Sequence, residues 1–535
     1  MSTPQSVIYI CSGVRINSRY EHSIYFASAG AQQEYFAGKV VKTLSAYSYL
    51  RKSWPLKVEA TMEQAKTWNY LFFRNTSTGK LYYYFINTVE YVNDGTVELG
   101  LELDVIQTYL FDFQLLPSFV ERQHTTTDSI GEFAVDEGLD LGEYVNNGVY
   151  HFNLTDLCIM VMCTINPNST TAAAAEVHAL PYMYNRVFSG VKFWAVNSAD
   201  WVKWGQQLDK LDELGVSESI VAMWMYPKSL VVLGGEDTWT NGEIAHVVER
   251  AYGLTDGGYS TPITRPANLN YYVPKNNKLF GYPYNFIYAT NNQGGSAVYK
   301  YEYFTLSETP GFRLTGSLGP DGGVRLVPVD YKLRGEANYD EGLTLNNFPT
   351  CAWDSDTYKL WLAQNQNTLN HSATTAGLKV AAGIATGLAG LFTGGVMAAG
   401  AGVGMAASGG LQIGQQLAQK KDMDIAPPQS RGSFSTSVNI TNNKHTFSLY
   451  QRSITYEAAR IIDDYFTMYG YKLNRVQTPN INARPAFTYV KTIGCHIKGN
   501  MCNEDTVKVE AIFDNGITFW KNGDKVADYS QNNQV

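Results

Sequence analysis

The sequence predicts a mainly β protein with some α-helix (α+β), with strand-rich segments at both ends. Tyrosine is abundant, with 37 Tyr in 535 residues, and aromatic residues make up 13% of the chain. Aromatic side chains favour strands, and the Asn, Gly and Thr between them favour turns. Runs that alternate apolar and polar residues are a second indication. A long stretch of Gly, Ala and aliphatic residues interrupts this pattern in the last third of the chain.

The N-terminal segment is expected to be all-β. Three strand-like runs are joined by turns, the second of which is Asn93-Asp94-Gly95, and this is the pattern of a meander. The three runs are residues 70–74, 80–92 and 96–104. A short helix or bend is expected within 106–113 and another strand over 119–124, before a polar stretch marks a boundary.

The rest of the chain is expected to be mixed. Ser198 can cap a helix that ends before Gly215, with Trp201, Trp204, Leu208 and Leu211 on its core face. Further helices are expected over 356–370 and 456–469, the latter stopped by Gly470. Expected strands are 151–164, 229–233, 279–290, 296–305, 311–329, 434–451, 486–494 and 507–521.

Composition excludes several classes of protein. A net charge of −8 argues against a broad basic surface for gripping nucleic acid. Six scattered cysteines are too few for a disulfide scaffold, so reduced, buried thiols are expected. The first residues lack the basic start and apolar run of a signal peptide, so we expect synthesis in a cytoplasm without export by that route.

Residues 376–418 are the most informative segment, because they carry a single charge, Lys379. The segment is long enough for two membrane spans of about twenty residues each, with a reversal near Thr393-Gly394-Gly395. Its large apolar side chains contribute only about −4 to −8 kcal/mol to insertion of one copy. Burying Lys379 centrally would cost about 2.5–3.5 kcal/mol of that. One copy is therefore marginal in a membrane, and several copies together are not.

The candidate functional residues all lie in or next to this segment. The membrane-inserting candidates are Leu378, Val380, Ile384, Leu388, Leu391, Phe392, Val396, Met397, Val403, Met405, Leu411 and Ile413. The glycines that give the segment flexibility and close backbone approach are Gly383, Gly387, Gly390, Gly394, Gly395, Gly400, Gly404 and Gly410. Pro427 and Pro428 mark its exit. A flexible linker and a buried core hairpin are the alternatives, although linkers are normally polar.

No pattern for a nucleophile elbow, a phosphate-binding loop or a zinc protease occurs, and we expect no catalysis, metal or cofactor. The acidic pairs Asp136/Glu137 and Asp463/Asp464 are expected at the solvated surface. Cys495-His496 with Cys502 lacks a fourth zinc ligand at tight spacing. His124 near Asp128 could pair a base with an orienting acid, but no nucleophile lies nearby in the sequence.

Several strings, in this order, resemble one protein family. They are 103–109 (LDVIQTY), 118–124 (SFVERQH), 135–139 (VDEGL), 469–476 (YGYKLNRV), 484–490 (RPAFTYV) and 512–520 (IFDNGITFW). Together they are similar to the tail knob proteins of small short-tailed phages of Gram-positive bacteria, the phi-twenty-nine-like group. The resemblance covers both ends and the Gly/Ala segment, and little of residues 150–350 beyond position.

This resemblance implies a homo-hexameric tube at the distal tail end of the virion, made in the host cytoplasm. It implies a tube-forming β domain from residues 1–125 plus 430–535, a central knob region over 126–354, and a helix with a long hydrophobic loop over 355–429. The loops are expected to plug the lumen and then enter the host membrane as a channel for DNA, which passes without sequence-specific binding. Implied partners are other tail and collar proteins and a tail-tip cell-wall hydrolase.

Three other functions stay open on sequence alone. A pore-forming toxin also hides an apolar hairpin in a β-rich body. A tailspike that binds or degrades cell walls would fit the aromatic and β content. A multi-pass host membrane protein would fit the apolar segment but not the polar sequence on both sides of it.

Overall fold

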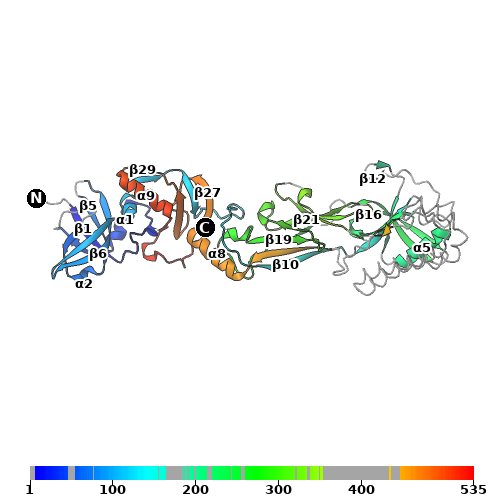
Figure 1. The fold of residues 1–535 in the computed structure, drawn as a ribbon, viewed down its shortest axis with the longest axis horizontal. Helices are drawn as coiled ribbons and strands as arrows, with labels where there is room; N and C mark the ends of the chain where they lie inside the picture. The colour runs from blue at the N-terminus through cyan, green and yellow to red at the C-terminus, as the bar shows by residue number, and fades with distance from the viewer. Residues whose placement is uncertain are drawn as a thin grey trace, which may run out of the picture. The chain divides into compact units, whose positions relative to one another are not determined.

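The computed structural model describes residues 6–45, 55–75, 78–154, 156–163, 183–184, 187–188, 192–197, 200–213, 220–241, 244–254, 260–317, 319, 322–333, 338–346, 348, 350–352, 433–434 and 446–535. The candidate residues between 378 and 428, and the helix expected over 356–370, lie outside this range. The described chain is mainly β with some α, as predicted (Figure 1).

The chain folds into two units, each built from separated stretches of sequence. Unit 1 comprises Met1–Val145, Ala267–Asn285 and Ser453–Val535, and unit 2 comprises Asn146–Pro266 and Phe286–Arg452. Unit 1 thus joins the first part of the chain, the last part and a short middle segment. The three-region division expected from the sequence stays a prediction.

Unit 1 contains a six-stranded sheet in the order β3-β1-β5-β6-β7-β4. Its strands are β1 (Ser6–Ser12), β3 (Val40–Leu44), β4 (Leu56–Glu59), β5 (Trp68–Asn75), β6 (Leu81–Asn93) and β7 (Thr96–Leu103). Its helices are α1 (Ala29–Ala37), α2 (Met62–Ala65) and α3 (Val105–Tyr109). The strands β5, β6 and β7 form the predicted meander. Tyr70 of β5 and Tyr83 of β6 pack on Phe36 of α1.

A five-stranded sheet in the order β2-β30-β28-β9-β27 combines both ends of the chain. Its strands are β2 (His22–Ile24), β9 (Ser118–Gln123), β27 (Tyr471–Gln477), β28 (Phe487–Ile493) and β30 (Ile517–Trp520). A two-stranded ladder pairs β8 (Phe113–Leu115) with β29 (Ile497–Gly499). The helices α8 (Tyr456–Tyr469) and α9 (Asn503–Asn515) belong to this part of unit 1.

The prediction of a strand over residues 507–521 is wrong for most of that range. Residues up to Asn515 form α9, and only β30 is a strand. The buried side chains Asp505, Val509, Ile512 and Phe513 recur at helical spacing, whereas Val507 is exposed. Gly516, at φ 92°, ends the helix before the strand begins.

Unit 2 contains a seven-stranded sheet in the order β16-β17-β14-β11-β15-β24-β25. Its strands are β11 (Leu157–Cys163), β14 (Lys192–Asn197), β15 (Ile220–Pro227), β16 (Val231–Asn241), β17 (Ile244–Leu254), β24 (Thr350–Ala352) and β25 (Ser433–Phe434). The predicted helix at 198–214 is α5 (Trp201–Glu213), and its Trp204 and Leu211 are buried as expected.

Two four-stranded sheets complete the larger elements. One, in the order β10-β26-β19-β20, contains β10 (Tyr144–Asn153), β19 (Asn285–Thr290), β20 (Ser296–Tyr299) and β26 (Thr446–Ile454). The other, in the order β18-β21-β22-β23, contains β18 (Ser260–Pro262), β21 (Gly311–Gly316), β22 (Val324–Val329) and β23 (Leu343–Leu345). A short hairpin pairs β12 (Met183–Tyr184) with β13 (Val187–Phe188). The short 3₁₀ helices are Lys228–Leu230, Asn277–Phe280, Tyr301–Tyr303, Tyr339–Glu341 and Gly523–Lys525.

The helix α8 has the bounds that the sequence predicts, and both of its ends have a clear cause. Thr455 caps its first turn by accepting from the Ala458 amide. Gly470 ends it at φ 65°, and a Cβ atom at this position would lie 2.4 Å from the carbonyl carbon and oxygen of Gln123. Glycine is therefore required here both by the backbone conformation and by the close approach of β9.

We predict that Gly470→Ala destabilises the protein by about 2–5 kcal/mol, because left-handed strain and overpacking add together. Gly494 is the matched control: it has the same φ of 65°, but a Cβ atom added there would have no neighbour within 4 Å. Gly494→Ala is expected to cost only about 1–2 kcal/mol. Urea unfolding of both variants measures the difference, and equal losses would contradict the role given to the Gln123 contact.

Candidate functional site

Two places in the structure bear on function: the base of the apolar segment in unit 2, and a buried ionic junction in unit 1. All candidate residues named from the sequence, including Phe392, Met397, Pro427 and Pro428, lie outside the described residues. Among the described residues, no helix combines the length and apolar character needed to cross a bilayer. The described residues do include the two points at which the apolar segment joins the rest of the chain.

The segment leaves and re-enters the described chain at a single strand pair. Cys351 pairs with Phe434 and Ala352 with Ser433, in antiparallel register. The outgoing strand β24 is itself paired with β15, where Ala352 lies opposite Ala222. Residues 353–432 therefore form one insertion, and its two ends are hydrogen-bonded neighbours at the end of the seven-stranded sheet.

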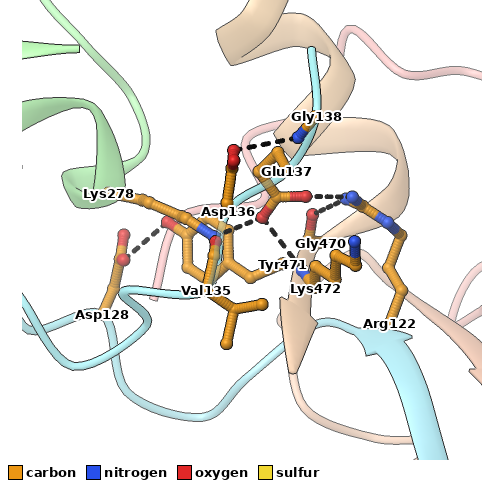
Figure 2. Close-up of polar contacts among 10 residues, drawn as sticks. All are labelled: Arg122, Asp128, Val135, Asp136, Glu137, Gly138, Lys278, Gly470, Tyr471 and Lys472. Carbon is orange, nitrogen blue, oxygen red and sulfur yellow. Dashed lines mark hydrogen bonds and ion pairs between the residues drawn. The ribbon is translucent and has the colours of Figure 1, made fainter. Parts of the chain in front are cut away.

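The ionic junction lies in unit 1 and is centred on Glu137, whose side chain is fully buried. Its carboxylate forms ion pairs with Arg122 of β9 and with Lys278, and accepts a hydrogen bond from the Lys472 amide at 3.0 Å. Figure 2 shows the carboxylate between these three donors. Glu137, Lys278 and Lys472 come from three separate stretches of sequence, so the junction ties all three parts of unit 1 together.

The two cations of the junction are also held by neighbouring groups. Arg122 donates to the Gly470 carbonyl at 2.7 Å and lies over the Tyr465 ring, 4.7 Å from its centroid. Lys278 donates to the Val135 carbonyl at 2.9 Å. Burial lowers the pKa of Lys278, and the charge of Glu137 opposes this shift.

Asp128 forms a second tie between the same three stretches. Its carboxylate accepts from the Tyr471 hydroxyl at 2.6 Å (Figure 2). It also accepts from the Asn277 amide at 2.9 Å. Burial, and then the charge of Asp128, raise the pKa of the Tyr471 phenol well above its ordinary value. The phenol therefore stays neutral and remains a donor at physiological pH.

Asp463 of α8 forms a third tie and is completely buried. It accepts from the Tyr272 hydroxyl at 2.9 Å, the Lys275 amide at 2.7 Å and the Asn276 amide at 3.1 Å. Burial raises the pKa of Asp463, while these hydrogen bonds favour its charged form. The site fixes the segment around residue 275 on the helix.

The structure corrects the expectation that both acidic pairs are solvated. Asp136 is exposed, but Glu137 is buried; Asp464 is half-buried, but Asp463 is fully buried. One member of each pair faces inward because adjacent residues point in different directions. Sequence reasoning missed these sites because their partners lie far away in the chain. The only available signal was that Glu137, Arg122 and Lys472 all occur in the strings that resemble one family.

His124 does not pair with Asp128. Its Nδ1 accepts from the Tyr489 amide at 2.8 Å, and its Nε2 lies 3.0 Å from the Thr467 carbonyl. Both ring nitrogens are thus used by backbone groups, with Nε2 as the donor. Burial, followed by the nearby Arg484 charge, lowers the pKa of His124 to about 3. These contacts make His124 a neutral structural side chain.

We predict that Glu137→Gln destabilises the protein by about 3–5 kcal/mol, because it leaves two buried cations without their counter-charge. The neighbouring substitution Asp136→Asn removes an exposed carboxylate and is expected to cost about 0.5 kcal/mol or less. Chemical denaturation of the two variants tests this. Similar losses for both substitutions would show that the buried ion pairs contribute little.

We also predict a specific pH dependence from His124. Its folded pKa lies below the ordinary value of 6.5, so between pH 6.5 and about 3 the unfolded chain binds a proton that the folded chain does not. Its contribution to stability is therefore lost as pH falls, by about 1.4 kcal/mol per pH unit at most. His124→Gln keeps one donor and one acceptor but cannot titrate. Its unfolding free energy should decline less steeply than that of the wild type between pH 6.5 and 4.

Comparison with known proteins agrees with this architecture. A family model described as the C-terminal domain of the Bacillus phage phi29 tail knob protein gp9 matches residues 252–534. A second model, the N-terminus of the caudoviral major tail protein, matches residues 4–114. The solved structure of the tail knob protein gp12 of bacteriophage C1 has the same fold. Its TM-score is 0.64 at 15% identity, with 98% of each chain covered.

Full-length relatives support the same conclusion. The tail knob protein gp9 of Bacillus phage B103 is 28% identical, over 99% of this chain and 98% of the relative. The gp9 proteins of Bacillus phages PZA and phi29 are each 25% identical, over the same shares of both chains. The chain therefore belongs to the family of phi29-like tail knob proteins, which are structural components of the phage tail.

Proposed function

We propose that the protein assembles as a homo-hexameric tube at the distal tail end, through which the phage DNA leaves. In this proposal the tube contacts other tail and collar proteins and a tail-tip cell-wall hydrolase. Residues 376–418 of each copy plug the lumen and, once expelled, insert into the host cell membrane as a channel. The observation that carries the proposal is one long insertion, residues 353–432, which contains the nearly uncharged segment 376–418 and has both ends at a single strand pair.

The paired ends of the insertion favour a segment that changes its surroundings independently. Because Ala352 and Ser433 are hydrogen-bonded neighbours, the insertion starts and finishes at the same point of the sheet. Moving it from one environment to another therefore does not require the strands at its base to separate. An insertion whose ends were far apart would transmit strain to the body of the protein.

Energetics favour several copies acting together. One copy gains only about −4 to −8 kcal/mol on insertion, before the cost of burying Lys379. Six copies would gain up to tens of kcal/mol by the same scale, an upper figure that omits the ordering of the chain. Glycine at positions such as Gly394 and Gly395 allows the segment to thread a narrow lumen and then repack.

The charge of the chain suits a conduit for DNA. With a net charge of −8, each copy lacks the broad excess of Lys and Arg that grips phosphate. If the acidic side chains face the lumen, DNA slides past without adhering. A basic lumen in the assembled tube would remove this part of the proposal.

The alternatives have less support. The relatives are tail knob proteins by name, which favours a virion component over a secreted toxin. For a cell-wall hydrolase, the described residues that sequence reasoning considered as acid and base are engaged elsewhere. His124 is held by two backbone groups, and Asp128 by Tyr471 and Asn277.

We predict that replacing residues 353–432 with Asn-Gly abolishes leakage of dye from liposomes while the protein still folds. The paired residues Ala352 and Ser433 are placed to be joined by a two-residue hairpin turn, which Asn-Gly favours. Wild-type protein should release dye, more strongly after mild acidification or another trigger. Leakage is measured with a quenched fluorophore at equal protein concentration.

A second variant controls for the length of the insertion. It keeps residues 353–432 but changes Leu388, Leu391, Phe392 and Val396 to Ser. This variant should also lose leakage, because insertion depends on the large apolar side chains. Wild-type leakage by either variant, with assembly intact, would overturn the membrane role of the segment.

A further inference from the structure

A tight turn in unit 1 has an unusual residue at its tip. Leu269 and Tyr272 exchange two backbone hydrogen bonds of 2.8 and 2.9 Å, which closes a two-residue hairpin. Its central residues, Asn270 and Tyr271, have φ values of 46° and 70°. Positive φ at both central positions defines a turn that prefers Asn and then Gly. Asn270 fits this preference, and Tyr271 does not.

Among the residues that the structure describes, the packing of a single copy gives no reason for Tyr271. A non-glycine residue in the left-handed region costs about 1–2 kcal/mol relative to the ordinary backbone. The Tyr271 side chain is 89% exposed, so packing within the described part of its own copy does not offset this cost. Strained backbone clusters at functional sites, so an exposed ring held in such a backbone marks a candidate contact surface.

The turn is held rigidly in place. Leu269 is fully buried, and the Tyr272 hydroxyl donates to Asp463 at 2.9 Å. The Tyr272 ring also packs edge-on against Tyr456, with 5.5 Å between centroids. Next to it, Val273 is 67% exposed. We call Tyr271, Val273 and Tyr456 the tyrosine knob; because it is ordered beforehand, it loses little entropy when it binds.

A second uncovered apolar surface lies on the five-stranded sheet of the same unit. Val476 of β27 and Ile493 of β28 are both in register with Phe119 of β9, which lies between them. In-register residues of neighbouring strands share one face of a sheet. Val476 is 69% exposed and Ile493 57% exposed, and Phe119 is half-buried. We call Val476, Phe119 and Ile493 the apolar row.

Charges beside the two surfaces are complementary. Glu457 follows Tyr456 of the knob and is exposed, whereas Arg475 precedes Val476 of the row and is exposed. Within the described residues, neither side chain forms an ion pair with an opposite charge; Arg475 donates to Gln477 at 2.7 Å. An exposed aromatic knob flanked by an acid and an exposed apolar row flanked by a base match each other in charge.

We infer that the tyrosine knob of one copy packs on the apolar row of a second copy of this chain. The inference rests on the proposed hexamer and names the surfaces that join it. Because the two surfaces differ, the contact is heterologous, which is the kind that closes into a ring of more than two subunits. Tyrosine is enriched at such contacts because its ring buries area and its hydroxyl stays polar.

We expect Tyr271→Gly to separate folding from assembly. Glycine relieves the left-handed strain, so the melting temperature of the monomeric protein should stay the same or rise. Assembly should weaken by about tenfold or more in concentration, the effect of removing a central interface tyrosine. Sedimentation velocity over a concentration series measures assembly in the absence of lipid. Val476→Ser, in the apolar row, should also weaken assembly.

Leu333→Gly is the matched control. Leu333 is also a large apolar side chain at positive φ, 60°, and is 97% exposed, but it lies in unit 2. Its replacement gives the same backbone relief without touching either surface, so assembly should equal that of the wild type.

A charge exchange between the two surfaces is a third test of the contact. Glu457→Arg and Arg475→Glu should each weaken assembly, and the double variant should regain it.

Each outcome decides the inference. Wild-type assembly by Tyr271→Gly, or a double variant no better than the single ones, overturns the contact while leaving the hexamer intact. A wild-type protein that stays monomeric at all concentrations overturns both the hexamer and the contact. If Tyr271→Gly assembles normally but loses binding to purified cell walls, the knob recognises glycan and the inference fails.

Discussion

The Glu137 carboxylate lies fully buried between two cations, and a buried charge of this kind is tolerated only when its neighbours satisfy it. Its three donors, Arg122, Lys278 and Lys472, come from parts of the chain separated by more than a hundred residues. Apolar contacts alone allow neighbouring chain segments to shift along one another, whereas an ion pair with fixed donors sets their positions. The junction therefore fixes how the separated stretches of unit 1 meet. Asp128 and Asp463 add further ties nearby, through uncharged hydroxyl and amide donors.

This constraint explains how unit 2 can be inserted twice into unit 1. The chain leaves unit 1 after Val145 and again after Asn285, and returns at Ala267 and Ser453. Each return adds another segment to unit 1, and that segment needs contacts that fix its position there. The short segment 267–285 is held by polar ties to Asp463, Asp128 and Glu137. Its buried side chains Leu269, Tyr272, Leu279 and Tyr284 also pack in a core that includes residues of α8. The apolar segment is a further insertion, within unit 2, and its base needs only a strand pair.

Local elements could be predicted from the sequence where one physical cause dominates. The helix α8 was predicted with the bounds observed, because Gly470 ends it; the structure adds the Thr455 cap at its start. The helix α9 was predicted as a strand, because Val507 and Val509 alternate with polar residues while the buried face follows a helical period. The ionic junction could not be predicted from the sequence, because Glu137 and its partner Lys278 are 141 residues apart and leave no local pattern. The candidate membrane residues, from Leu378 to Ile413, stay predictions.

Two of the positive-φ positions of unit 1, Gly470 and Tyr271, separate what folding requires from what it does not. At Gly470 the backbone conformation and the residue agree, since any side chain would strike Gln123. At Tyr271 a similarly positive φ, 70°, is adopted by a residue with a large ring that is 89% exposed. The polar ties that hold unit 1 also hold this turn, because Tyr272 is bonded to Asp463. The strain at Tyr271 is thus maintained by the same framework that positions the chain segments, and the described residues of a single copy leave its ring uncovered.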